Sequence, residues 1–230
     1  MELTGNYRHE LKYQIGPADH LALRQRLKAV MQQDLHTSAD GRYTIRSVYF
    51  DNYRDKALRE KVDGVQRREK FRIRYYNDDL SFITLEKKLK HNNLCMKVDA
   101  PLTAEDYRRI LQAPGPWMLE HPQPLVRELC CKMKTQQLRP RVLVSYVREP
   151  YVYAAGNVRV TFDSNIRTSL FQREFLNGAL PDIIATDAPG DIILEVKYDA
   201  FLPEVIRALL QTGALRQQAF SKYGACRRFG

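Results

Sequence analysis

Basic side chains occupy alternate positions in several short segments whose remaining positions are apolar. In the segment FRIRYY, Arg72 and Arg74 are two residues apart, and in ILEVKYD the carboxylate of Glu195 precedes the amine of Lys197 by the same spacing. Because side chains alternate across a β-strand, residues two apart lie on the same face. Each segment therefore predicts a strand that has one apolar face and one charged face.

The same alternation recurs along the chain. It aligns Glu10 with Lys12, Glu86 with Lys88, Tyr146 with Arg148, Arg159 with Asp163, and Thr44 with Arg46. For a single strand of this kind, a sheet face in contact with water is the usual explanation. Because nearly every such segment carries Arg or Lys near its middle, we expect the charged faces to converge on a common interior.

Basic side chains gathered in such an interior need counter-charges. Like charges that are buried together repel one another, so they require either interleaved carboxylates or a bound polyanion. Phosphate is the natural candidate, because a guanidinium group can bind two of its oxygens at once. The basic residues predicted to face a phosphate ligand are Lys12, Arg46, Arg72, Arg74, Lys88, Arg148, Arg159 and Lys197.

Four carboxylates are interleaved with these cations, and they could supply metal ligands. Hard oxygen donors are the ligands that Mg²⁺ or Mn²⁺ prefers when it bridges phosphates. We expect Glu195 to be a metal ligand, with Glu10, Glu86 and Asp163 as candidate helpers. For these three helpers, pairing with the basic residues alone is the slightly favoured alternative.

The elements that would position these residues are mainly strands. Eight segments are rich in β-branched and aromatic residues with period-two patterning, and they span residues 8–15, 43–50, 66–76, 80–88, 96–101, 141–151, 157–167 and 191–198. Helical periodicity appears at 17–31, 103–111, 124–137 and 202–210. Turn residues at Asn77-Asp78-Asp79 and Ala155-Gly156-Asn157 predict antiparallel hairpins. The predicted fold is α+β, a single domain over residues 1–230 in which about eight mainly antiparallel strands close into a tunnel-like barrel with helices packed outside.

Composition supports a polyanionic ligand. Lys and Arg number 37 against 27 Asp and Glu, which gives a formal charge of +10. The sequence contains no apolar run long enough for a transmembrane helix and begins with charged residues, so we expect a cytoplasmic protein. The four cysteines lack CxxC spacing and the five histidines are scattered. Neither a zinc site nor a nucleophile with a histidine partner is predicted.

The ordered series HELKY, FRIRYY, LEKK, SYVRE, VRVTFD, LEVKY and SKY resembles the VTC domain, the polyphosphate polymerase module of the vacuolar transporter chaperone family. That domain is one of the triphosphate tunnel metalloenzymes, a CYTH-like superfamily. The resemblance spans Tyr7 to Tyr223. It implies a tunnel that binds a nucleoside triphosphate, with ATP as the expected donor, and transfers its γ-phosphoryl group to polyphosphate with Mn²⁺ or Mg²⁺ as cofactor.

The resemblance also assigns roles to individual residues. The implied catalytic set is Lys12, Arg72, Arg74, Arg148, Arg159 and Glu195, with Glu195 as the metal ligand. It further implies that Tyr146 and Lys222 contact phosphate; from the residues alone, Lys222 would be a solvated surface side chain. One departure concerns the first strand, where hydrolases of the superfamily carry ExExK but this chain reads RHELK, which keeps only the second acid.

Three functions remain open for such a tunnel. The first is polyphosphate synthesis, which the missing acid favours. The second is hydrolysis of tripolyphosphate or of a nucleoside triphosphate, and the third is a binding module without catalysis. Nucleic acid is the least favoured ligand, because the basic residues recur at strand centres on one face and do not form an exposed basic helix or arm.

Overall fold

Ten strands form one antiparallel sheet in the computed structural model, which describes residues 7–92, 94–170, 183–184, 190–211 and 215–229. The strands are β1 (Arg8–Ile15), β2 (Gln32–Gln33), β3 (Tyr43–Asp51), β4 (Arg67–Tyr76), β5 (Asp79–His91), β6 (Leu94–Leu102), β7 (Arg139–Tyr153), β8 (Val158–Leu170), β9 (Ile183–Ile184) and β10 (Ile192–Tyr198). The short strands β2 and β9 extend the sheet beside β7 and β8.

The other eight strands close into a ring. Their order is β7-β3-β4-β5-β6-β1-β10-β8, and β8 pairs back onto β7 from Val142–Leu170 to Tyr153–Val158. The shortest contact in the ring joins β1 to β6 through Arg8–Cys95 and His9–Leu94. The prediction of about eight antiparallel strands in a closed, tunnel-like arrangement is confirmed.

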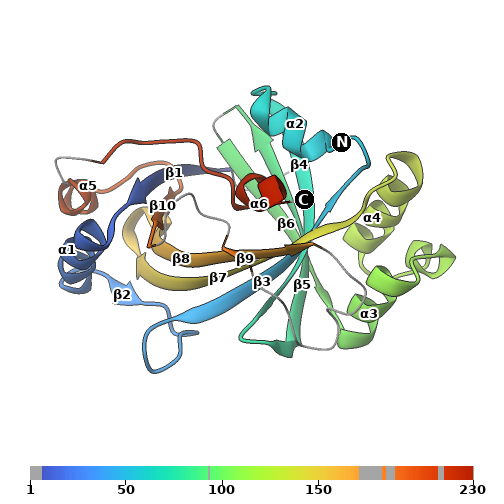
Figure 1. Cartoon of the computed structure of the whole chain (residues 1–230). Helices are drawn as coiled ribbons and strands as arrows, with labels where there is room; N and C mark the ends of the chain where they lie inside the picture. The colour runs from blue at the N-terminus through green and yellow to red at the C-terminus, as the bar shows by residue number, and fades with distance from the viewer. Residues whose placement is uncertain (1–6, 93, 171–182, 185–189, 212–214, 230) are drawn as a thin grey trace.

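Helices cover two sides of this ring (Figure 1). They are α1 (Pro17–Lys28), α2 (Lys56–Val62), α3 (Ala104–Gln112), α4 (Pro124–Thr135), α5 (Glu204–Leu210) and α6 (Lys222–Cys226), with 3₁₀ turns η1 (Pro116–Leu119), η2 (Ala155–Asn157) and η4 (Arg227–Phe229). The four predicted helices are present, whereas α2 and α6 were not predicted. None of the helices that the structure describes is long and apolar enough to cross a membrane.

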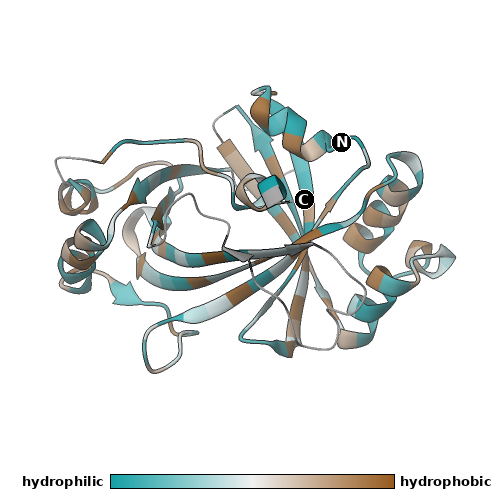
Figure 2. Cartoon of the chain, viewed as in Figure 1, coloured by the Kyte–Doolittle hydropathy of each residue, from teal (hydrophilic) through white to brown (hydrophobic). Residues whose placement is uncertain are grey.

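The outer faces of the strands form two apolar clusters beneath the helices. On one side, Phe71 and Ile73 of β4 pack with Leu129 of α4. On the other, Leu194 of β10 packs with Leu23 of α1. Polar and apolar residues alternate along the strands, as the banded colours of Figure 2 show. The period-two pattern thus buries one face of each strand under a helix and leaves the other face for the interior.

Part of the interior is apolar as well. A third cluster combines inner-face residues of several strands, among them Ile45 of β3, Val144 and Tyr146 of β7 and Ile193 of β10. The interior therefore holds apolar as well as charged side chains in this region. An eight-stranded ring is only just wide enough for side chains, so this cluster fills part of the interior and confines the charged residues to the rest.

Two turns fix the register of the hairpins. Tyr76 pairs with Asp79 across β4 and β5, and the two connecting residues Asn77 and Asp78 have φ values of 49° and 58°. This is the two-residue turn whose twist matches that of antiparallel strands, and Asn and Asp tolerate its positive φ. At the β7–β8 hairpin, Gly156 has a φ of 71°, and an added Cβ would lie 2.6 Å from the carbonyl oxygen of Phe201. Both predicted hairpins are confirmed.

Candidate functional site

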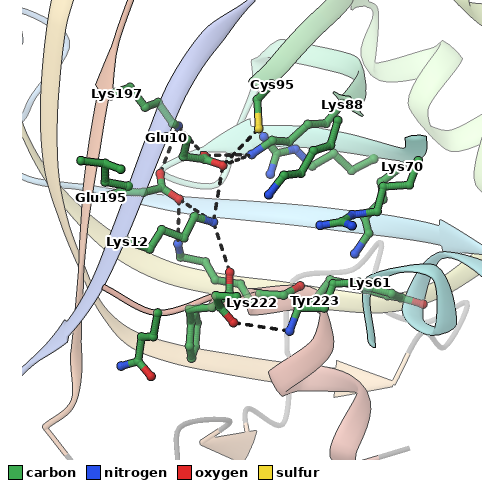
Figure 3. Close-up of a pocket in the computed structure, with 18 of the residues that line it drawn as sticks. Glu10, Lys12, Lys61, Lys70, Lys88, Cys95, Glu195, Lys197, Lys222 and Tyr223 are labelled. Atoms are coloured by element: carbon green, nitrogen blue, oxygen red, sulfur yellow. Dashed lines mark hydrogen bonds and ion pairs between the residues drawn. The ribbon is translucent and has the colours of Figure 1, made fainter. Parts of the chain in front are cut away.

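A pocket of about 600 Å³ opens inside the ring of strands. Inner-face residues of β1, β4, β5, β7 and β10 line it, and the segment from Gln217 to Tyr223 forms a further wall (Figure 3). Most of the residues predicted from the sequence meet here. They are Glu10, Lys12, Arg72, Arg74, Lys88, Tyr146, Arg148, Glu195, Lys197 and Lys222.

Two arginines of β4 are held in place by a carboxylate on β5. Arg72 Nε donates to Glu86 Oε2 at 2.7 Å and its Nη1 donates to the Tyr49 hydroxyl at 2.8 Å, while Arg74 Nη1 lies 3.6 Å from Glu86 Oε1. Burial alone would raise the pKa of Glu86, but the two guanidinium groups outweigh it and hold that pKa below its ordinary value. Glu86 does not line the pocket. Its oxygens are bound by the neighbouring arginines, so we interpret Glu86 as a group that orients them.

Glu195 of β10 lies among four cations. Its oxygens are 3.0 Å from Lys12 Nζ, 3.0 Å from Lys197 Nζ, 3.2 Å from Arg148 Nη2 and 3.8 Å from Lys222 Nζ. The side chain is 4% exposed. Burial would raise the pKa of Glu195, but the surrounding positive charges dominate and keep it ionised.

A second buried carboxylate, Asp163 of β8, organises the same corner. Arg148 binds it bidentately, with Nε and Nη2 at 2.6 and 2.7 Å, and Lys222 Nζ lies at 2.5 Å. Asp163 is 0% exposed and does not line the pocket. Its oxygens are thus occupied by two cations. We interpret Asp163 as a group that orients Arg148 and Lys222.

Glu10 of β1 connects the two sides of the pocket. Both of its oxygens accept hydrogen bonds from Lys88 Nζ at 2.8 Å, and it lies 3.9 Å from Lys12 Nζ and 3.6 Å from Lys197 Nζ. Burial would raise the pKa of Glu10, yet these lysines lower it below the ordinary value. Glu10 is therefore an anion that faces the pocket together with Glu195.

Two of the predicted phosphate-binding residues lie elsewhere. Arg46 is on the outer face of β3, opposite Tyr75, and pairs with Asp78 at 2.7 Å. Ser47 and Tyr49 occupy the inner face of that strand, so the prediction placed Arg46 on the wrong side of the sheet. Arg159 is also outside the pocket lining; its Nη2 is held by Asp34 at 2.7 Å and by Tyr43 at 2.8 Å.

Four pocket cations were missed by the sequence analysis, namely Lys61, Arg68, Lys70 and Lys90. Three of them continue the alternating pattern of basic residues in the sequence. Arg68 and Lys70 continue the alternation of Arg72 and Arg74 toward the start of β4, and Lys90 continues that of Lys88 on β5. Lys61 belongs to α2, which has no strong periodic pattern.

The pocket carries far more positive than negative charge. Eleven basic side chains line it, and four carboxylates (Glu10, Glu86, Asp163 and Glu195) contact them, so its described residues have a formal excess of seven positive charges. Such an excess inside a partly closed space concentrates multivalent anions. The arrangement can therefore bind a ligand of several phosphates.

Glu10 and Glu195 could hold a divalent cation together with phosphate oxygens. No three His, Cys, Asp or Glu side chains in the described part of the chain lie close enough to hold a metal ion by themselves. However, the amines of Lys12 and Lys197 each contact both carboxylates, so the two acids lie close together. In phosphate sites Mg²⁺ commonly takes one or two carboxylates and completes its shell with phosphate and water. The donor set fits a cation that binds with its phosphate ligand.

The C-terminal wall of the pocket is anchored by a buried tyrosine. Tyr223 donates its hydroxyl to Asp51 Oδ2 at 2.6 Å and stacks on Tyr49, with ring centroids 5.2 Å apart. The same carboxylate accepts backbone N–H groups of Ala57 and Leu58 at the start of α2. Asp51 thus joins α2 to the segment that carries the adjacent Lys222.

Tyr223→Phe should lower the free energy of unfolding by about 1–3 kcal/mol, because it removes a donor from the buried Asp51 while the ring stack remains. Denaturant unfolding measures the change. Tyr53→Phe is the control, since Tyr53 is 63% exposed. An equal effect in the two variants would contradict the anchoring role of the Tyr223 hydroxyl.

Acid should destabilise the ligand-free protein. Ion pairs lower the folded-state pKa of Glu10, Glu86 and Glu195 below their ordinary 4.5. Their contribution to stability is therefore complete above pH 4.5 and is lost as the pH falls through the lowered values. We expect the urea midpoint to fall between about pH 5 and pH 2. Glu86→Gln should show a smaller decrease over that range, and a midpoint independent of pH in the unaltered protein would contradict the account.

Comparison with known proteins places this geometry in a family. Among curated proteins, none matches the sequence. Solved structures with a similar fold include a "putative adenylate cyclase" from Bacillus halodurans. It is 14% identical with a TM-score of 0.55, and the alignment covers 95% of this chain and 96% of that one. Another protein so described, from Vibrio parahaemolyticus, is 11% identical with a TM-score of 0.51 over 96% of this chain and 98% of its own. The model of the VTC domain matches residues 7–229, and the chain therefore belongs to the VTC domain family.

Proposed function

We propose that this chain is a polyphosphate polymerase that transfers the γ-phosphoryl group of a nucleoside triphosphate, with ATP as the expected donor, to a growing polyphosphate chain. The observation that carries the proposal is the large excess of positive charge among the residues that line a single pocket. Membership of the VTC domain family supports phosphate as the ligand. The residues proposed to contact phosphate are Lys12, Arg72, Arg74, Lys88, Tyr146, Arg148, Lys197 and Lys222.

The reaction exchanges one phosphoanhydride bond for another. An oxygen of the acceptor's terminal phosphate forms a bond to the γ-phosphorus, and the bond from that phosphorus to the β,γ-bridging oxygen breaks. The nucleoside diphosphate leaves with the electron pair. Because the attacking oxygen is already anionic, no strong general base is needed.

The protein's contribution is alignment and neutralisation of charge. Arg72 is fixed by Glu86 and Tyr49, and Arg148 by Asp163 and Glu195, so these guanidinium groups are oriented before any ligand binds. Preorganised donors of this kind stabilise charge on the transferring oxygens without reorganising during the reaction.

Glu195 with Glu10 would hold a divalent cation, Mn²⁺ or Mg²⁺, which would supply positive charge to neutralise the phosphate ligand. Lys12 and Lys197 contact both carboxylates and keep them oriented toward the pocket. Tripolyphosphate or nucleotide hydrolysis would use the same groups, with an ordered water in place of the acceptor.

Product analysis distinguishes these reactions. Purified protein is incubated with ATP and Mn²⁺, and the products are separated on a gel that resolves long polyphosphate from orthophosphate. Long chains together with ADP support the polymerase. Orthophosphate alone would replace it with the hydrolase, and tight binding of tripolyphosphate without turnover would indicate a binding module.

A further inference from the structure

At one end of the pocket, four basic side chains lack a carboxylate partner among the described residues. This outer cationic cluster consists of Lys61, Arg68, Lys70 and Lys90. Lys61 Nζ donates to the carbonyl oxygen of Ala219 at 3.4 Å, Arg68 Nη1 donates to that of Val65 at 2.7 Å, and Lys70 Nζ lies 4.9 Å from the ring centre of Tyr223. Carbonyl oxygens and an aromatic ring carry no formal negative charge, so none of these contacts neutralises the basic side chains.

The register of the sheet makes this cluster costly in the absence of a ligand. Arg68 lies directly opposite Lys90, and Lys70 directly opposite Lys88. Like charges that face each other across antiparallel strands are destabilising. Lys88 is neutralised by Glu10, but the other three cations are not. Burial, together with the charge of Arg68, lowers the pKa of Lys70 to about 7, because the opposing effect of the Asp51 carboxylate is smaller.

The outer faces of the same two strands are arranged differently. There, Lys87 of β5 pairs with Glu69 of β4 and with Glu128 of α4. The buried cation on this outer face, Lys87, thus has two carboxylate partners. The absence of such partners in the outer cationic cluster points to an external anion.

The cluster continues the row of cations that begins near the reacting groups. Arg68, Lys70, Arg72 and Arg74 lie at alternate positions of β4, and a strand rises about 3.4 Å per residue, so the row is about 20 Å long. Lys88 and Lys90 form a parallel row on the neighbouring strand. A row of about 20 Å, flanked at its outer end by a second pair of cations, suits an extended chain of phosphates better than a compact anion.

We propose that the outer cationic cluster binds polyphosphate several phosphates away from the reacting end, so that the pocket prefers chains longer than tripolyphosphate. This inference rests on the proposed function only for the identity of the anion, polyphosphate. The cluster supplies binding along the chain, whereas the groups around Glu195 hold the reacting phosphates.

Affinity as a function of chain length tests the inference. Calorimetry without nucleotide gives the Kd of tripolyphosphate and of a size-fractionated longer polyphosphate for the unaltered protein and for Arg68→Ala/Lys90→Ala. We expect the double variant to lose at least about tenfold in affinity for the longer chain and less than about threefold for tripolyphosphate. The quantity compared between proteins is the Kd of tripolyphosphate divided by the Kd of the longer chain, which should decrease in the double variant. A longer chain has a statistical advantage at any site, but this advantage is the same in both proteins and cancels in the comparison.

The matched control is Arg59→Ala/Arg67→Ala. Both arginines are exposed and outside the pocket lining, and Arg67 immediately precedes Arg68 on the opposite face of β4. This control removes two charges from the same region and should leave the ratio unchanged. Because Arg68→Ala/Lys90→Ala relieves repulsion, we also expect its unfolding midpoint without anion to equal or exceed that of the unaltered protein.

Two results would overturn the inference. The first is an unchanged ratio, which includes an equal loss of affinity for both ligands. The second is single-stranded RNA of matched charge that binds as tightly as polyphosphate and loses as much affinity in the double variant. The proposed function fails separately. If the unaltered protein makes no polyphosphate from ATP while the ratio decreases in the double variant, the polymerase proposal is wrong and polyphosphate binding by the outer cationic cluster is supported. If long chains form while the ratio is unchanged, the polymerase proposal is supported and the role of the cluster is wrong.

Discussion

Glu195→Gln is expected to lower turnover at least about a hundredfold while leaving the affinity for tripolyphosphate equal to or higher than that of the unaltered protein. Glutamine keeps the size of the side chain but loses the charge proposed to hold the divalent cation. The same change removes one negative charge from a pocket that binds anions. Turnover should therefore fall without a loss of tripolyphosphate binding.

Steady-state turnover with ATP and calorimetric binding of tripolyphosphate without metal measure the two effects. Circular dichroism checks that the variant is folded, since Lys12 and Lys197 lose a buried partner. Glu128→Gln is the matched control, because Glu128 pairs with Lys87 on the outside of the barrel. Proportional losses of turnover and binding in Glu195→Gln would contradict a role in chemistry for Glu195.

Arg148→Ala should destabilise the protein by about 3–5 kcal/mol, because removing one partner from a buried ion pair leaves the other uncompensated. Asp163 would keep Lys222, but it would lose a bidentate contact at 2.6 and 2.7 Å, and Glu195 would lose a contact at 3.2 Å. Arg148→Lys keeps the positive charge but cannot bind Asp163 through two N–H groups as the guanidinium does, so it should recover only part of the lost stability. Urea unfolding without phosphate measures both variants.

The control for this series is Arg207→Ala, whose arginine is on the surface of α5 and pairs with the exposed Glu204. It should change the free energy of unfolding by less than about 0.5 kcal/mol. Tripolyphosphate should stabilise the unaltered protein more than Arg148→Ala, since a ligand stabilises according to its affinity for the folded state. A stability of Arg148→Ala within error of the Arg207→Ala control would show that the buried network is not as described.

The period-two pattern of the strands was enough to predict most of the barrel. In FRIRYY, Phe71 and Ile73 face the apolar cluster under α4, and Arg72 and Arg74 face the pocket, as the alternation requires. Alternation alone does not say which face is inside. Arg46 shows the consequence: β3 carries polar residues on both faces, and it is Ser47 and Tyr49 that point inward.

Contacts between segments far apart in the chain could not be predicted from the local pattern of residues. Lys222 enters the pocket because Tyr223 stacks on Tyr49 and binds Asp51, which lies 172 residues earlier in the chain. Nothing in the segment AFSKYG indicates those contacts, and only the resemblance to the VTC domain pointed to Lys222. Short helices such as α2 and α6 are stabilised by tertiary packing and caps, which single-sequence periodicity does not show.

The structure also distinguishes between the four buried carboxylates by the residues that each one contacts. Glu86 and Asp163 bind arginines inside the ring of strands without lining the pocket, whereas Glu10 and Glu195 line it. From the sequence, all four were equivalent acids at alternate positions. The register of β1 against β10 places Glu10 opposite Lys197 and Lys12 opposite Glu195, which brings together the two acids that line the pocket.

The most direct test of the central claim is to follow the γ-phosphoryl group itself. Protein is incubated with γ-labelled ATP, Mn²⁺ and a short polyphosphate primer, and the label is traced after the products are separated. We predict that the label appears in polyphosphate longer than the primer, with one ADP released for each phosphate added. Label recovered only as orthophosphate, or retained wholly in ATP, would contradict transfer to polyphosphate in this pocket.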